Sequence, residues 1–327
     1  MDIVSPKTVR VDSCSECQLK CPLCSSLLPN NIIGKGKLRF EDFRRILENN
    51  PQIEMVQLAN KGEAFLNEEL PKILSYAYEK KVTTSIGNGI NLNDATDEVL
   101  EALVKFQTFS VRISIDGATQ KTYEKYRIGG NLKRVLNNVQ KINLLKEKYN
   151  SARPNLLYQF IIFGHNEREM GMAKVLARML KMEIVFKLNH TPDVFSVVDR
   201  NLVKKYTEFT DRKEYFEKKG IEYIRNGCYH LWKSPQINWD GRLFGCSKNT
   251  WLAFEKNVFN EKLAQYANSE KMVYARKMLM GKVPPDKDIP CSSCEKYFSL
   301  VKHGNWITEL EIQEAIKGNG FSFFHSA

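Results

Sequence analysis

Long apolar runs are missing from this chain of 327 residues. No segment approaches the roughly 20 consecutive apolar residues that a helix needs to cross a bilayer. The start of the chain also lacks the succession of a charged stretch, an apolar run and a small-residue cleavage site that marks a secretory signal. We therefore predict a cytoplasmic protein that has no membrane among its partners.

The sequence also lacks tracts typical of nucleic-acid binding, such as a Gly/Arg-rich tail or a basic block interleaved with aromatic residues. Its net charge is +11, from 49 Lys and Arg against 38 Asp and Glu. Such an excess can attract an anionic partner, for example a phosphorylated substrate or nucleic acid. Acidic residues are interleaved with the basic ones, as in 133–148 and 204–219, so we expect a lysine-rich solvated surface rather than a nucleic-acid interface.

Eight cysteines are present, and in a cytoplasmic chain they favour metal ligation over a disulfide framework. Cys17, Cys21 and Cys24 have C-x3-C-x2-C spacing. Thiolates are soft ligands for iron–sulfur clusters or zinc, and three of them are one short of a closed tetrahedral site. The alternative is a structural zinc or redox site that also uses Cys14.

Apolar periodicity predicts strands that alternate with helices, which indicates an α/β fold with a parallel sheet and helices outside it. Asp94 is the expected N-cap of one helix, and Gly129-Gly130 interrupts another. The expected strands are 8–12, 53–58, 82–86, 109–115, 156–163 and 183–188, the expected helices 39–49, 68–80, 94–106, 119–148, 167–180 and 204–219, and 28–37 is an expected loop.

The strand over 109–115 carries polar residues at alternate positions. Alternation places Arg112, Ser114 and Asp116 on one face of the strand. In a barrel this face is the interior, where unpaired polar groups are unfavourable, so these residues need partners or a ligand. The alternative for Asp116 is that it caps the next helix.

The second half of the chain has its own cysteines. The segment 237–246 predicts a β-hairpin, because its Asp240-Gly241 pair is a strong turn signal. Four thiolates can close an iron–sulfur cluster completely, and a four-cysteine zinc site is the alternative. The cysteines of this set are Cys228, Cys246, Cys291 and Cys294.

The first cysteine loop and the strand-end motifs resemble the radical S-adenosylmethionine (SAM) superfamily, and the second set resembles the auxiliary-cluster module SPASM in its shortened form, Twitch. This resemblance implies a partial (β/α)6 TIM-like barrel followed by a small cysteine-rich domain. The expected limits are 1–190 for the barrel, 191–220 for a helical bridge, and 221–327 for the auxiliary domain with C-terminal helices. The further cysteines of a full SPASM module are absent, so one auxiliary cluster is expected.

The resemblance also implies roles for named residues. Cys17, Cys21 and Cys24 would hold a 4Fe–4S cluster whose open iron chelates SAM, and the second cysteine set would hold an auxiliary 4Fe–4S cluster. Asn60-Lys61-Gly62-Glu63 is similar to the Gly-Gly-Glu-Pro segment that binds the SAM amino group, although Lys61 and Ala64 depart from it. The SAM-binding residues implied are Gly62, Glu63, Asn88, Ser114, Asp116 and Arg127.

Several of these positions could instead have a purely structural role. Gly87-Asn88-Gly89 is also an ordinary turn sequence, and Arg127 could be a surface arginine. Residues near the ends of the last two strands could reach a substrate, although lone residues of this kind are more often structural. They are Gln159, Lys187, Asn189 and His190.

The implied activity is reductive cleavage of SAM to a 5′-deoxyadenosyl radical, which abstracts hydrogen from a small sugar- or cyclitol-like metabolite. Net oxidation assisted by the auxiliary cluster is favoured over epimerisation or decarboxylation, with flavodoxin or ferredoxin as reductant. The catalytic residues are unknown, and Arg112, Asp116 and Cys14 are weak candidates. Cys14 would be either a hydrogen donor or an inert core residue.

Two other functions remain open at this point. The first is modification of a ribosomally made peptide by epimerisation, crosslinking or oxidation. Because the cluster loop begins at residue 17, we expect no N-terminal leader-binding domain, and a separate protein would have to bind the leader. The second is a non-enzymatic zinc or nucleic-acid-binding protein.

Overall fold

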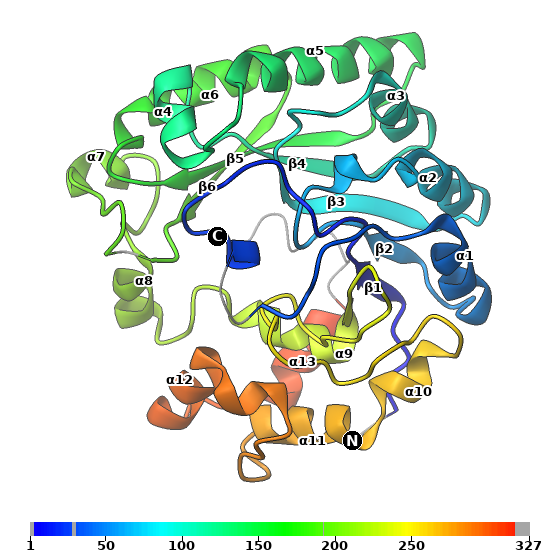
Figure 1. Cartoon of the computed structure of the whole chain (residues 1–327). Helices are drawn as coiled ribbons and strands as arrows, with labels where there is room; N and C mark the ends of the chain where they lie inside the picture. The colour runs from blue at the N-terminus through cyan, green and yellow to red at the C-terminus, as the bar shows by residue number, and fades with distance from the viewer. Residues whose placement is uncertain (1–2, 28–30, 192, 318–327) are drawn as a thin grey trace.

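A seven-stranded sheet forms the centre of the molecule, in the order β6-β5-β4-β3-β2-β1-β7 (Figure 1). The computed structural model describes residues 3–27, 31–191 and 193–317. Every neighbouring pair of these strands is parallel, and the sheet does not close on itself. The strands are β1 Thr8–Val11, β2 Met55–Gln57, β3 Thr83–Ile90, β4 Ser110–Ser114, β5 Asn155–Ile162, β6 Glu183–Leu188 and β7 Gln236–Ile237.

The helices between the first six strands lie outside the sheet (Figure 1). Their apolar side chains pack on the outward residues of the strands, such as Val56, Ile86 and Val111, which are fully buried. This arrangement confirms the predicted partial TIM-like barrel. The helices are α1 Phe40–Asn49, α2 Leu70–Glu79, α3 Asp97–Lys105, α4 Gln120–Tyr126, α5 Leu132–Lys148 and α6 Met170–Met179.

The second half of the chain contributes mainly short helices. In Figure 1, α7 and α8 lie on the β6 side of the sheet and the others lie beneath it. None of the helices in the described part of the chain is long and apolar enough to cross a membrane. The domain limits at 190 and 220 stay predictions. These helices are α7 Arg200–Lys204, α8 Arg212–Lys219, α9 His230–Lys233, α10 Leu263–Ala267, α11 Glu270–Leu279, α12 Glu295–His303 and α13 Glu309–Lys317.

The predicted hairpin around Asp240-Gly241 is present. The backbone N–H of Asn238 donates to the carbonyl of Arg242 over 2.9 Å, and that of Phe244 donates to Gln236 over 2.8 Å. Its first strand, β7, also pairs with β1. The hairpin therefore joins the second half of the chain to the edge of the barrel sheet, which the sequence did not predict.

Three local expectations are wrong. Gly87–Gly89 is not a turn at the end of a strand but part of β3, whose pairing with β4 is irregular there. Asp94 does not cap α3, because the Thr96 hydroxyl accepts from the Val99 N–H instead. The helix expected over 204–219 is shorter, because α7 ends at Lys204 and α8 begins only at Arg212.

Two other expectations have different outcomes. The interruption at Gly129-Gly130 is confirmed, since it separates α4 from α5. Part of the loop expected over 28–37, namely residues 28–30, lies outside the described residues.

Candidate functional site

The first cysteine loop follows β1 at the carboxyl edge of the sheet. Its turn closes with a hydrogen bond from the Cys24 N–H to the Cys21 carbonyl over 3.0 Å, and the Lys20 N–H donates to Ile128 over 3.0 Å. Cys21 is buried, Cys24 is half-buried and Cys17 is exposed. The loop thus presents its three thiols from a backbone that is fixed to the segment between α4 and α5.

The segment after β2 packs directly against the stem of this loop. Gly62 has φ +68°, and a Cβ there would lie 2.4 Å from the Cys14 carbonyl oxygen. The next N–H, of Glu63, donates to the Glu16 carbonyl over 2.7 Å. Only glycine allows both this backbone conformation and this approach without strain.

Glu63 is 2% exposed, and its Oε2 accepts from the Asn91 N–H over 2.6 Å. Burial raises the pKa of this carboxyl to about 7, although backbone hydrogen bonds oppose the shift. Asn91 also contacts the cysteine loop, because its Nδ2 lies 3.6 Å from the Cys17 Sγ. Asn91 therefore connects the Glu63 carboxyl to Cys17, which is a predicted cluster ligand.

Lys61, which departs from the family pattern, bridges two parts of the site. Its backbone N–H donates to the Asp12 Oδ1 over 2.9 Å, and its Nζ donates to the Ser25 hydroxyl over 2.7 Å. The pKa of Lys61 is lowered because the side chain is buried. The charges of Asp12, Cys24 and Cys246 oppose this shift without cancelling it. The extra side chain therefore lies between the two cysteine sets.

Asp116 and Arg127 form a buried ion pair beside the loop. The Arg127 Nε donates to the Asp116 Oδ2 over 2.7 Å, and its Nη1 lies 3.5 Å from the Cys21 Sγ. Burial alone would lower the pKa of Arg127, but the Asp116 charge outweighs it and the pKa is raised. Arg127 is therefore not a surface arginine, and its side chain is 12% exposed.

Asp116 is held in place by Arg127, by the Ile161 backbone and by the Asn166 side chain, which donates to the Asp116 carbonyl over 2.9 Å. Its Oδ1 accepts from the Ile161 N–H over 2.6 Å, and its φ of 52° is uncommon outside glycine. It does not cap α4, since the Thr119 side chain does. A buried carboxylate in such a backbone conformation at a strand end is typical of a functional site.

Ser114 belongs to a polar layer inside the barrel. Its hydroxyl accepts from the Gln159 Nε2 over 2.9 Å, and a Cβ at Gly89 would lie 2.4 Å from it. Arg112 is 4% exposed on the same strand. By contrast, Asn88 is exposed and donates to the side chain of Asn60 over 2.8 Å, so it lies apart from this layer.

The end of β6 reaches the cysteine loop from the other side. A ring nitrogen of His190 is 3.1 Å from the Leu23 carbonyl. Asn189 instead stabilises its own turn, because its Nδ2 donates to the carbonyls of Thr191 and Val194. Lys187 lies half-buried on β6.

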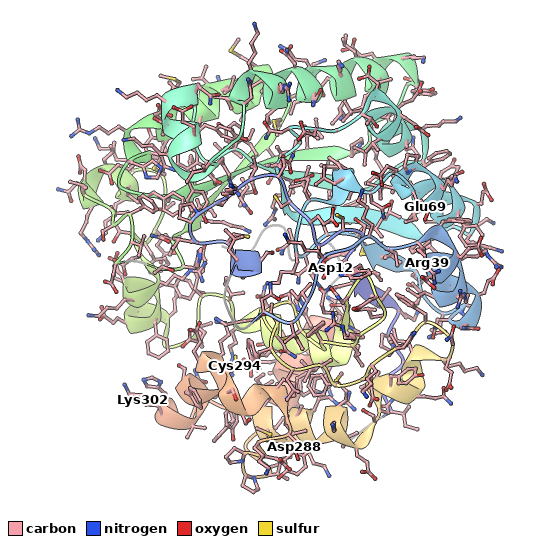
Figure 2. All side chains as sticks on the ribbon, viewed as in Figure 1. Asp12, Arg39, Glu69, Asp288, Cys294 and Lys302 are labelled. Carbon is pink, nitrogen blue, oxygen red and sulfur yellow. The ribbon has the colours of Figure 1, made fainter. Side chains whose placement is uncertain are left out.

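Two residues near the first site were missed from the sequence. Asn91 links Glu63 to the cysteine loop, as described above. Asp12 ends β1 and accepts from the Asn60 and Lys61 N–H groups and from the Gln236 Nε2, near the middle of the molecule in Figure 2. The only sequence feature that could have indicated Asp12 is that it is an acidic residue directly after a buried strand.

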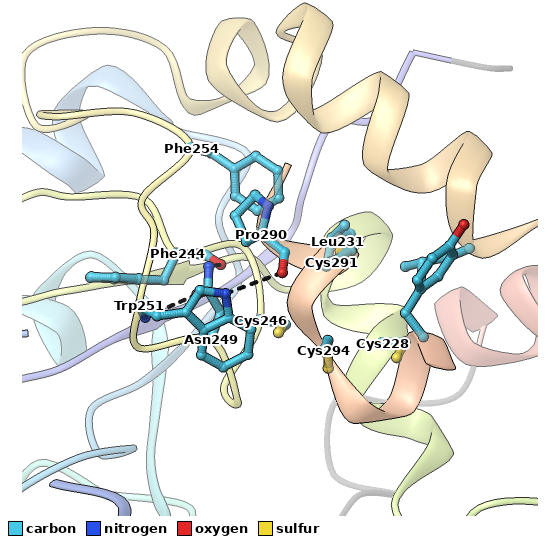
Figure 3. A pocket seen from close by; sticks show the side chains of 12 residues that line it. Cys228, Leu231, Phe244, Cys246, Asn249, Trp251, Phe254, Pro290, Cys291 and Cys294 are labelled. Carbon is cyan, nitrogen blue, oxygen red and sulfur yellow. Dashed lines mark hydrogen bonds between the residues drawn. The ribbon is translucent and has the colours of Figure 1, made fainter. Parts of the chain in front are cut away.

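The second cysteine set lines one pocket, whose empty space is about 380 Å3 including its opening. Figure 3 shows its four cysteines on segments that are far apart in sequence. Cys228 lies in the 3-10 helix Arg225–Tyr229, Cys246 follows the hairpin, and Cys291 and Cys294 both lie just before α12. The apolar lining includes Leu231, Phe244, Trp251, Phe254, Leu279 and Tyr297.

The thiols of this pocket act on one another. Burial, and then the charges of Cys246 and Cys294, raise the pKa of Cys228 to about 12. Burial and the other three cysteines raise the pKa of Cys291 well above its usual range. Burial also raises the pKa of Cys246. Thiols whose ionisation is disfavoured in this way are stabilised as thiolates when metal ions supply the opposing charge.

Comparison with solved structures finds the same fold. The chain resembles SuiB of Streptococcus suis bound to precursor peptide SuiA, with a TM-score of 0.62 and 14% identity over 91% of this chain and 71% of SuiB. SuiB bound to S-adenosylmethionine matches with a TM-score of 0.62 and 13% identity, over 89% of this chain and 71% of SuiB. BtrN in complex with AdoMet (SAM) and 2-DOIA matches with a TM-score of 0.50 and 15% identity, over 90% of this chain and 94% of BtrN.

These neighbours are radical SAM enzymes. The chain has the radical SAM fold. No protein-family model and no curated protein sequence matches it, so at these identities the likeness concerns the fold. The resemblance seen in the sequence is confirmed at that level.

The donors of both cysteine sets are of the type that iron–sulfur clusters use. Within residues 3–27, 31–191 and 193–317, no three His, Cys, Asp or Glu side chains converge closely enough to hold one ion. A 4Fe–4S cube has a different requirement, because each thiolate binds its own iron and the sulfurs stay apart. Both cysteine sets present soft thiol donors, three on one loop and four around one pocket.

Cys14, the remaining cysteine, is 1% exposed. Its Sγ contacts the Glu16 carbonyl over 3.7 Å, and burial raises its pKa to about 11. We predict that Cys14→Ala keeps the iron content and the turnover. Product formed in deuterated water should carry no solvent deuterium at the reacting carbon. Wild-type product that carries this deuterium, with loss of the label in the variant, would instead make Cys14 a hydrogen donor and the enzyme an epimerase.

Proposed function

We propose that this chain is a radical SAM enzyme that cleaves SAM reductively and oxidises a small sugar- or cyclitol-like metabolite. The observation that carries the proposal is the set of groups around one cysteine loop. Glu63, Asp116 and Arg127 come from the ends of three different structural units, and all of them approach the loop of Cys17 and Cys21.

Each of these groups suits a part of the cofactor. Cys17, Cys21 and Cys24 would hold a 4Fe–4S cluster with one open iron. Glu63 supplies a carboxylate for the SAM ammonium group. Arg127, fixed by Asp116, supplies a cation for the carboxylate. Gly62, Ser114 and Asn88 are the further SAM contacts that we propose.

A 4Fe–4S cluster held by Cys17, Cys21 and Cys24 would supply the electron for reductive cleavage of SAM to methionine and a 5′-deoxyadenosyl radical, the species that would abstract hydrogen from the substrate. The barrel's own contribution is to orient both molecules and to exclude water. Flavodoxin or ferredoxin is the proposed reductant, and the reducing cytoplasm is the proposed compartment.

The second cysteine set would hold an auxiliary 4Fe–4S cluster, which would supply the acceptor for one electron of the substrate radical. With loss of a proton to solvent, the net reaction would then be an oxidation. Support comes from the position of this set. The charges of Lys61 and Arg10 act on the Cys246 thiol, and Asn60 donates to the carbonyl of Ser247 over 3.2 Å. The residues after β2 thus contact the segment that carries Cys246.

A second candidate is modification of a ribosomally made peptide. SuiB, with the higher TM-score, was solved with a precursor peptide, while BtrN, of which 94% is covered, was solved with 2-DOIA. The polar interior formed by Arg112, Ser114 and Gln159 favours a small polar substrate over an extended peptide.

The test is anaerobic reconstitution of the full chain with iron and sulfide. We expect two 4Fe–4S clusters, about eight irons per chain. Incubation with SAM and dithionite should then release methionine and 5′-deoxyadenosine. A colourless protein that carries stoichiometric zinc and leaves SAM intact would overturn the proposal in favour of a zinc-binding protein.

Glu63→Gln should weaken SAM binding about ten- to a hundredfold, because a charge-assisted contact contributes on the order of 1.5–3 kcal/mol. The amide keeps an oxygen for the Asn91 N–H, so iron content should not change. In the wild type, SAM affinity should rise as pH increases through the Glu63 pKa of about 7, since the ionised carboxylate binds the ammonium group. Calorimetry between pH 6 and 8 measures both effects. Equal affinities for the two proteins would remove Glu63 from the site.

A further inference from the structure

Lys187 faces the interior of the barrel from β6. In the parallel register Ser114 lies beside Gln159, Gln159 beside Val185, and Ile161 beside Lys187. Neighbouring residues in such a register point to the same side of the sheet, and alternate residues of one strand do as well. Because Ser114 and Gln159 meet inside the barrel, Lys187 points inward too.

A second cation, Arg212, lies at the same end of β6. It begins α8, which lies below α7 on the β6 side of the molecule in Figure 1. Its guanidinium donates to the Leu188 carbonyl over 3.2 Å and lies over the Tyr223 ring at 4.9 Å. We call Lys187 and Arg212 the interior cations.

The interior cations have no carboxylate partner among the described residues. No ion pair is formed by either side chain, and Lys187 has no hydrogen-bond partner within residues 3–27, 31–191 and 193–317. The acids whose charges act on these two side chains have other partners. Asp116, near Lys187, pairs with Arg127. Glu295 and Glu222, near Arg212, pair with Lys248 and Lys296.

The local field is correspondingly positive. Burial lowers the pKa of Lys187 well below its usual range, and the charges of Arg112 and Arg212 lower it further. Holding half-buried cations together without counter-charge is unfavourable, and an anion between them relieves the repulsion and favours the protonated amine. Both side chains are half-buried, so part of each stays accessible.

The interior cations lie beside the proposed SAM site. The Asp116 and Arg127 charges act on Lys187, and Arg127 reaches the Cys21 Sγ. Three residues further along the chain, His190 contacts the cysteine loop at Leu23. A molecule bound to Lys187 would therefore be near the place where the radical forms.

We propose that Lys187 and Arg212 bind an anionic group, a carboxylate or a phosphate, of the substrate. As a substrate site this rests on the proposed function, whereas anion binding itself does not. The same chemistry could come from the carboxylate of SAM, and the experiment separates the two sources. The substrate class is then an acidic or phosphorylated sugar- or cyclitol-like metabolite rather than a neutral or purely cationic one.

The test uses the anaerobically reconstituted full chain with saturating SAM and titrates it with orthophosphate in a calorimeter. Wild type should bind phosphate, and Lys187→Gln and Arg212→Gln should each bind it about tenfold more weakly. Lys187→Arg should restore binding, which shows that a loss in Lys187→Gln is not misfolding. Lys213→Gln is the matched control, because this neighbour on α8 is 83% exposed and its loss should change nothing.

Absence of phosphate binding by the wild type, or equal binding by wild type and both Gln variants, would overturn the proposal. SAM affinity should be the same in all variants and insensitive to phosphate. Competition between phosphate and SAM would assign the cations to the SAM carboxylate and overturn the substrate assignment. Reductive cleavage of SAM is measured separately, so failure of the proposed function is visible even where phosphate binding depends on Lys187.

Discussion

Replacement of Cys17, Cys21 and Cys24 by alanine together should leave about half of the iron and abolish SAM cleavage. The reason is the separation of the two cysteine sets. The three thiols belong to one loop after β1, whereas the other four line a pocket in the second half of the chain. Loss of one set removes one of two clusters, about four of about eight irons.

Iron and sulfide analysis, together with detection of 5′-deoxyadenosine, measures this result. The reciprocal variant, with alanine at Cys228, Cys246, Cys291 and Cys294, is the control. It should also keep about half of the iron, but it should still cleave SAM. Full iron content in the first variant would refute the assignment of its three ligands.

Gly62→Ala should lose SAM cleavage and part of the iron, although it changes no predicted ligand. The new Cβ would lie 2.4 Å from the Cys14 carbonyl oxygen and 2.5 Å from the Ser15 carbonyl carbon. These are backbone atoms, which cannot rotate away as a flexible side chain can. The cysteine loop or the Glu63 segment must therefore move, and a shift of about 1 Å in a reacting site can reduce a rate by roughly a hundredfold.

Gly220→Ala is a closely matched control for this variant. Gly220 has φ +69°, close to the +68° of Gly62, but no atom lies within 4 Å of a Cβ built on it. Both substitutions carry the same backbone strain, on the order of 1–2 kcal/mol, and only Gly62→Ala adds the collision. We expect Gly220→Ala to retain iron and activity. Wild-type cleavage rates in Gly62→Ala would show that the close packing after β2 is not required.

The sequence predicted the architecture well where a pattern is repeated over many residues. The strand expected over 183–188 is β6, Glu183–Leu188, and each of the other expected strands is found within a few residues. The cysteine spacings were the basis of the ligand assignments, because metal ligation constrains both residue type and interval, and these assignments stay predictions. Periodicity and spacing are properties of short stretches of sequence, so they can be recognised without knowledge of the fold.

Signals that depend on tertiary contacts were not accessible. Gly87–Gly89 has turn chemistry, but pairing with β4 and the close approach of Gly89 to Ser114 keep it within β3. Asn91 acts through partners that are distant in sequence, such as Cys17. β7 is only two residues long, so it has no periodicity to detect.

The pairing of β7 with β1 makes the cysteine-rich half part of the barrel's construction. Arg10 and Asp12 at β1 both contact the Gln236 side chain, and these polar groups are buried. A fragment that stops before residue 236 would expose β1 as an unpaired edge strand, which invites aggregation. It would also leave those buried groups without their partner. The second half of the chain therefore cannot be removed without exposing the barrel sheet. Any shortened version of the protein must replace the strand that β7 provides.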